Sequence, residues 1–249
     1  MKKLILFAVL LFSQHGFAQD SATVEVKQVS NIIKTNVAGY FMRNYNLTYE
    51  RIISKRISIA GGFGIIGNGK IPFESSFNNN DALISADAEI KGSNFTIEPR
   101  IYLGKGFGQG FYLAPYFRYS TFEVNNIVYD FRGTYSGFAY DFPLNFSGKV
   151  SGASGGLMIG AQWFLGNSKK WVLDAWFVGA HYGKGSGTVS GRTNETLTPE
   201  MQAELKKNLD DLDIPLVKYT TTVNEHGADA VLDGPWAGIR SGISIGYRF

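Results

Sequence analysis

Charged residues placed at alternating positions of apolar segments are the first candidates for chemistry in this sequence. Paired carboxylates and cations can relay protons, line a pore or form salt bridges. No neighbouring nucleophile accompanies them, so we expect a structural ionic cluster in a narrow interior. A proton path or small gated pore is the first alternative, and general acid–base chemistry is the second. The set comprises Lys34, Glu50, Glu98, Arg100, Arg118, Asp174 and Arg240.

Histidine provides a second candidate chemistry. His181 lies near the outer end of an expected strand, and His226 lies in a loop. A lipid-modifying or lipase-type enzyme would need a serine beside such a base, and Ser186 or Ser190 could meet His181. Histidines at a rim are usually without chemistry, so the sequence favours a protein that is not an enzyme.

Cofactors and metals are not expected. Residues 104–110 have the glycine spacing of a phosphate loop, but no helix follows them, so this segment is predicted to be a turn. The histidines and carboxylates lack metal-ligand spacing. The absence of cysteine excludes disulfides and thiolate metal sites. The small, scattered net charge of +3 gives no indication of nucleic-acid binding.

Strands must position these side chains, because apolar and polar residues alternate with period two in eight segments. The last segment is the clearest: Ile239 and Ile243 lie on one face, and Gly238 and Arg240 lie on the other. Charged residues make up only 18% of the chain, against ~25% in soluble domains. The expected strands are 33–41, 45–50, 57–65, 94–103, 111–120, 157–162, 171–182 and 236–249. The pattern predicts an all-β protein, an antiparallel transmembrane β-barrel of eight strands.

The connections between these segments alternate in length, as in outer-membrane barrels. Short turns are expected at 54–55, 104–110 and 166–169, and long extracellular loops at 67–92, 123–149 and 183–234. Within the long loops, residues 82–90, 125–131 and 137–146 could extend neighbouring strands.

The longest loop contains one predicted helix. Thr198 is its expected N-cap, and Met201, Leu205 and Leu209 recur at helical spacing as far as Asp213. This helix is expected to be a lid on the mouth of the barrel, a docking element for a partner, or an element packed within its own loop.

Both ends of the chain carry targeting signals. Residues 1–19 have the basic, apolar and small-residue regions of a signal peptide, which leaves residues 20–249 as one barrel domain. The chain ends on an amphipathic strand with Tyr247 and Phe249, the form of a C-terminal assembly signal.

Several short motifs resemble those of a known family. Residues 34–36, 46–51, 98–103 and 112–116 are similar to segments of small outer-membrane β-barrels from Bacteroidetes, most closely the DUF3575 family of unknown function. The resemblance implies a fold and a location rather than an activity. It carries over no catalytic residue and no cofactor.

The sequence therefore predicts an integral protein of the outer membrane of a Gram-negative bacterium, with a structural, surface-exposed or accessory role. The alternatives are an accessory subunit of a secretion or uptake complex, and a lipid A-modifying or lipase-type barrel enzyme. Expected partners are outer-membrane lipid, lipopolysaccharide and the barrel assembly machinery during insertion. No nucleic acid is expected, and other protein partners are unspecified by the sequence.

Overall fold

The computed structural model describes residues 30–70, 88–135, 138–211 and 217–249. The predicted signal peptide lies outside these residues. The described chain is all-β with a single α-helix. Its elements are β1 (Asn31–Asn36), the 3-10 helix η1 (Ala38–Met42), β2 (Asn44–Ile52), β3 (Ile57–Lys70), β4 (Glu89–Tyr102), β5 (Gly110–Tyr135), β6 (Phe138–Leu165), β7 (Trp171–Arg192), α2 (Pro199–Asp210), β8 (Lys218–Asn224) and β9 (Gly227–Arg248).

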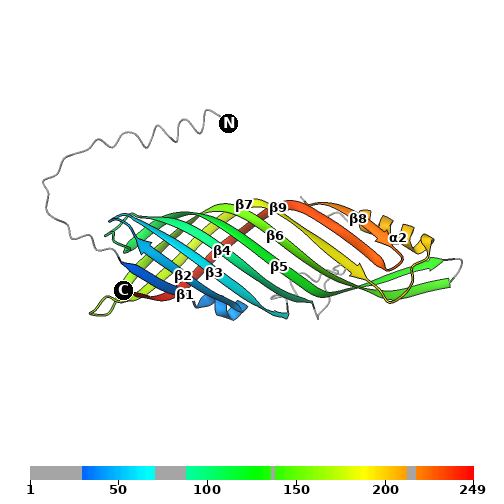
Figure 1. The fold of residues 1–249 in the computed structure, drawn as a ribbon, viewed down its shortest axis with the longest axis horizontal. Helices are drawn as coiled ribbons and strands as arrows, with labels where there is room; N and C mark the ends of the chain where they lie inside the picture. Colours follow the sequence, from blue (N-terminus) through cyan, green and yellow to red (C-terminus); the bar gives the residue numbers. More distant parts are fainter. Residues whose placement is uncertain (1–29, 71–87, 136–137, 212–216) are drawn as a thin grey trace, which may run out of the picture.

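Eight strands form a closed ring of antiparallel neighbours (Figure 1). The order runs from β1 to β7 and then to β9, and β9 pairs in turn with β1. The predicted antiparallel arrangement of eight strands is confirmed to this extent. The described part of the last loop also contains β8, which the sequence analysis missed and which pairs with β9 alone. No helix in the described residues is long and apolar enough to cross a membrane.

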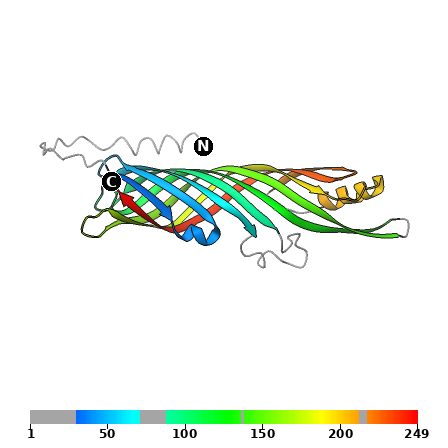
Figure 2. The same ribbon diagram turned by 60° about the horizontal axis from the view of Figure 1, so that its bottom comes forward.

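The strands of the ring are steeply inclined, as Figure 2 shows from a second direction. Starting from Lys34 and moving from each residue to its partner on the next strand, one circuit of the ring passes through Arg118 and ends at Trp236 of β9. The direct partner of Lys34 on β9, however, is Gly246. Such a stagger is required when a twisted sheet closes on itself. It also brings residues of distant strands to the same level inside the ring.

Side chains of the ring alternate between the two faces of the sheet, as the period-two pattern predicts. In β4, Thr96, Glu98 and Arg100 are buried inside, while Phe95 and Ile97 are exposed outside. The outer face is therefore apolar, and the inner face is polar and charged.

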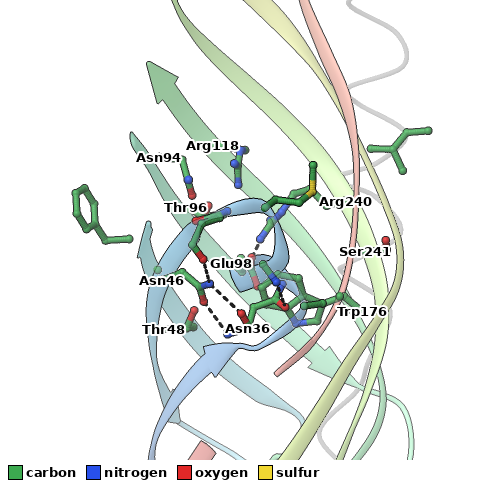
Figure 3. A pocket seen from close by; sticks show the side chains of 18 residues that line it. Asn36, Asn46, Thr48, Asn94, Thr96, Glu98, Arg118, Trp176, Arg240 and Ser241 are labelled. Carbon is green, nitrogen blue, oxygen red and sulfur yellow. Dashed lines mark hydrogen bonds and ion pairs between the residues drawn. The ribbon is translucent and has the colours of Figure 1, made fainter. Parts of the chain in front are cut away.

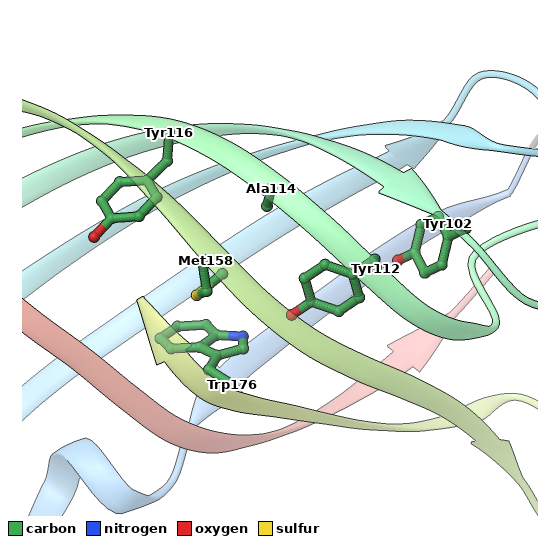
Figure 4. Packing of buried hydrophobic residues seen from close by; sticks show 6 residues of the cluster. All are labelled: Tyr102, Tyr112, Ala114, Tyr116, Met158 and Trp176. Carbon is green, nitrogen blue, oxygen red and sulfur yellow. The ribbon is translucent and has the colours of Figure 1, made fainter. Parts of the chain in front are cut away.

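Large rings from neighbouring strands fill one part of the interior (Figure 4). Tyr102, Tyr112, Tyr116 and Trp176 are buried there together with the smaller Ala114 and Met158. Gly160 faces this cluster, and no larger residue fits there because a Cβ would collide with the hydroxyl of Tyr112. Small residues on one strand thus make room for aromatic residues on the next.

Beyond the ring, β5, β6, β7 and β9 continue as a long extension of the sheet, which carries β8 and α2 (Figures 1 and 2). The predicted extensions of the strands on both sides of residues 136–137 are confirmed. The proposed addition at 82–90 is described only from residue 88, and β4 begins at Glu89.

Helix α2 begins where the sequence predicts it, because the Thr198 hydroxyl accepts a hydrogen bond from the amide of Met201. It ends at Asp210, before the predicted Asp213. The helix packs onto the extension, which favours local packing over a lid on the mouth of the ring. Residues Phe131, Phe142, Leu144, Leu197, Leu205 and Ala228 form the buried cluster between them. The Tyr140 hydroxyl also donates to Glu204 of the helix. Burial, together with that carboxylate, raises the pKa of Tyr140 to about 12.

The first strand is shorter than predicted. The sequence analysis extended it from Ile33 to Phe41, but β1 ends at Asn36 and the chain then turns through η1. The Asn46 side chain accepts from the amide of Asn36 at 2.7 Å and donates to its carbonyl at 3.1 Å. A side chain thus takes the place of main-chain pairing here. Ala38, in the part of the predicted strand that forms η1, is exposed.

Substitution of Leu205 tests whether the buried cluster holds α2 on the extension. The Leu205 side chain is fully buried, so Leu205→Ala should weaken the docking of α2 by roughly 2–5 kcal/mol. Hydrogen exchange in α2 and β8 should become faster, while amides in the ring should exchange as before. The exposed Lys207→Ala serves as the control. Unchanged exchange in α2 would show that the cluster does not hold the helix.

Candidate functional site

A network of buried charges crosses the interior of the ring. The Lys34 ammonium group donates to Glu50 at 2.6 Å, to Asp174 at 2.6 Å and to Gln162 at 2.7 Å. All four side chains are buried. They come from β1, β2, β7 and β6, so a single lysine connects strands that lie far apart in the sequence.

Arg100 continues the network. One terminal nitrogen lies 2.7 Å from Asp174 and 3.3 Å from Glu50, and the other lies 2.9 Å from Glu98. Glu98 in turn accepts from Arg240 at 2.9 Å. Three carboxylates therefore alternate with three cations, which is the arrangement that offsets the cost of removing charges from water.

Neutral groups saturate the remaining carboxylate oxygens. Tyr102 and Ser58 donate to Glu50 at 2.7 and 2.5 Å. Tyr112 donates to Asp174 at 2.8 Å, and its ring lies 4.5 Å from the Arg100 guanidinium. The sequence pattern placed both tyrosines on the inner face, but it gave no indication that they complete the ionic network.

The structure joins six of the seven predicted members of the cluster and leaves Arg118 apart. In the described residues, the Arg118 side chain has a single hydrogen bond, from Nε to the Ser120 hydroxyl at 3.0 Å, and no carboxylate lies within salt-bridge distance. Arg118 and Arg240 both line a cavity of about 410 Å³ (Figure 3). Trp176 and Glu98 also line this cavity.

His181 is not arranged as a catalytic base with a serine. Its Nδ1 lies 3.0 Å from the Tyr116 hydroxyl. The register of β7 shifts between Trp176 and Gly179, which turns His181 inward, whereas Ser186 has the opposite parity. Ser190 also has the opposite parity, and its hydroxyl donates to Asp229 at 2.6 Å. The proposed meeting of His181 with Ser186 or Ser190 is therefore wrong. The sequence analysis ended this strand at residue 182, but β7 continues through both serines to Arg192.

The remaining candidates from the sequence are His226, the glycine-rich segment 104–110 and possible metal sites. His226 is exposed and lies 3.4 Å from Glu225. Residues 104–110 form the predicted turn, with positive φ at Gly106, Gly108 and Gly110. No group of three or more potential ligand side chains in the described ranges could hold a metal ion.

The C-terminal aromatic residues lie on the outer face of the ring. Tyr247 and Phe249 are both exposed, and the backbone of Phe249 pairs with Asn31. The last strand thus ends beside the first.

Removing one charge from the network should be costly. Asp174→Asn would leave Lys34 and Arg100 short of a buried anionic partner, which should lower the free energy of unfolding by roughly 3–5 kcal/mol. Unfolding in detergent, followed by the mobility shift on heating, measures this change. The matched control is Asp233→Asn at an exposed position of β9. Equal stability of the two variants would contradict a coupled network.

Comparison with known proteins assigns neither a family nor an activity to this arrangement. The resemblance to the DUF3575 family therefore stays an expectation based on short motifs, and the role of the protein has to be argued from its geometry. No protein-family model matches the chain, and no curated protein matches it either.

Proposed function

We propose that this chain is an integral outer-membrane β-barrel with a closed lumen, which anchors a sheet-and-helix extension at the cell surface. Its role in this proposal is structural or accessory rather than enzymatic. The observation that carries the proposal is the division of the ring into an apolar outer face and an ionic inner face.

The outer face is suited to lipid. A soluble protein rarely exposes a large continuous apolar surface, whereas a membrane barrel needs one all around its wall. Exposed large residues on the ring include Leu47, Ile59, Phe63, Ile65, Phe95, Ile97, Phe117, Leu157, Ile159, Trp163, Ile243 and Ile245. Closure of the ring supports the same proposal, because paired strands satisfy backbone polar groups that lipid cannot.

The inner face supports a plug rather than a pore. An eight-stranded barrel is only wide enough for its side chains to fill. Lys34, Glu50, Arg100 and Asp174 meet inside the lumen and have no exposed side-chain surface. An ion crossing this layer would have to break several charge-assisted hydrogen bonds.

The orientation follows from the turns. The connections β2–β3, β4–β5 and β6–β7 are short and lie at the same end as Phe249, while the extension lies at the other end (Figure 1). Outer-membrane barrels have their short turns in the periplasm and their long loops outside. The predicted signal peptide and the terminal Tyr247 and Phe249 fit export and assembly by the same route.

The length of the extension favours a second candidate, an accessory subunit of a larger outer-membrane complex. Strand β6 alone has 28 residues, more than a membrane crossing of about 9–11 needs. Such an arm would give a partner protein a folded surface well above the membrane. Co-purification of a defined complex after mild detergent extraction, lost when α2 and β8 are deleted, would support this role.

Labelling tests the orientation. An epitope inserted at the exposed Asn194–Glu195 should be labelled on intact cells, because this segment belongs to the extension. One inserted at Ser54–Lys55 should be labelled only after the outer membrane is permeabilised. Labelling of the Ser54–Lys55 site on intact cells would indicate the opposite orientation. Recovery of the protein in the soluble fraction would contradict membrane insertion.

Conductance tests the plug. The purified wild-type protein in planar lipid bilayers should show no steady current, since the network leaves no continuous path for ions. A porin recorded in the same membranes provides the positive control. Large and stable open currents would favour a channel over a plug.

A further inference from the structure

One side of the ring wall is incomplete. Strand β9 pairs with β8 over Gly227–Asp233 and with β1 over Ser244–Arg248. Between them, no strand in the described chain pairs with this edge of β9, because β1 has already ended at Asn36. The short β1–β2 connection thus leaves a gap in the wall beside η1.

The cavity of 410 Å³ opens through this gap. Its lining combines inward residues such as Arg118 and Arg240 with the outward Ile239 of β9 and with Ala38 and Met42 of η1. A continuous sheet would separate the inward residues from Ile239, because they lie on opposite faces. Ile239 has 80% of its surface exposed. The cavity therefore connects the polar interior with the apolar outer face.

Positive charge inside the cavity is not balanced. Glu98 neutralises Arg240, whose guanidinium lies 4.8 Å from the Tyr116 ring and 4.9 Å from the Trp176 ring. Arg118 has no such carboxylate in the described residues, and its two terminal nitrogens make no hydrogen bond there. An arginine in this state is suited to bind a carboxylate or a phosphate.

A second observation points to a missing ligand. The Asn94 amide nitrogen is buried and has no hydrogen-bond partner among the described residues, and the same is true of the Asn44 amide oxygen. Buried polar groups are nearly always paired. Both asparagines line the same cavity, and Figure 3 shows Asn94 on the same wall of the cavity as Arg118. The spare donor of Asn94 and the guanidinium of Arg118 could therefore serve one anionic group.

We propose that the cavity binds a single-chain amphiphile with a carboxylate or phosphate head group. The head group lies against Arg118 and Asn94, and the apolar chain leaves through the gap past Ile239 and Met42. Membrane lipid as the source of the ligand rests on the proposed membrane location. The site itself does not depend on that location.

Native mass spectrometry of the full-length mature protein in a nonionic detergent tests the site. The probes are dodecanoate and dodecyl phosphate, with acetate and inorganic phosphate as their counterparts without a tail. The tailed anions should bind at one per chain, and Arg118→Gln should weaken their binding roughly tenfold or more. The exposed Arg51→Gln, which removes the same charge at the other end of the ring, should bind as the wild type does.

A second variant tests the gap without changing any charge. Ala38 lines the cavity and is exposed on η1, so Ala38→Trp should block the opening and abolish binding of dodecyl phosphate. Heat-modifiable mobility confirms that each variant is folded. Unchanged binding in Arg118→Gln would overturn the site, and unchanged binding in Ala38→Trp would overturn entry through the wall. Equal binding of inorganic and dodecyl phosphate would overturn the amphiphile. The binding assay uses protein in detergent, so its result does not depend on membrane insertion. A failure of the proposed membrane location would instead appear in the labelling and fractionation experiments.

Discussion

Closing eight strands into a narrow ring removes the inward side chains from water, so each charge there must find its partner on another strand. Lys34 shows how far this constraint reaches. It is the only inward charge on the short strand β1, and it contacts carboxylates from β2 and β7 on both sides of the closure. Arg100 reaches the same two carboxylates from β4 and adds Glu98. Buried pairs of this kind contribute little net stability, but breaking one is costly, so they specify register more than they add energy. A slip of one residue in any of these strands would turn its charge towards the outer face.

The same constraint divides the interior into two levels. Around the ionic network, all eight strands are present and side chains fill the space, including the ring of Tyr112. Higher up, β1 has ended and the wall lacks one strand. The inward residues at this level, Arg118 among them, line a cavity instead of a packed core. The cavity is thus a consequence of one feature, a first hairpin that is shorter than its neighbours.

Much of the fold could be predicted from alternation alone, because period two in a strand fixes which side chains share a face. This is why Glu50, Glu98 and Arg100 were predicted to face inward. Pairing could not be predicted, since it depends on the stagger accumulated around the ring. Arg118 was grouped with the network for this reason, although it lies above it. The end of β1 was missed because the Asn46 side chain substitutes for a strand partner. The meeting of His181 with Ser186 or Ser190 was misjudged because β7 continues through both serines, which therefore face away from His181. Strand β8 left a signal that was overlooked, the run Tyr219-Thr220-Thr221-Thr222-Val223 followed closely by Gly227.

Arg118 is the residue that folding alone does not account for. A threonine or leucine at that position of β5 would fill part of the cavity and would have no charge to remove from water. Every other cation of the ionic set is matched by a carboxylate within 3.3 Å. The cost of Arg118 is therefore not offset inside the described part of the protein. The cavity in front of its guanidinium opens onto the apolar outer face beside Ile239. The opening beside η1 therefore gives a ligand with an apolar part a route to Arg118 that does not cross the ionic network.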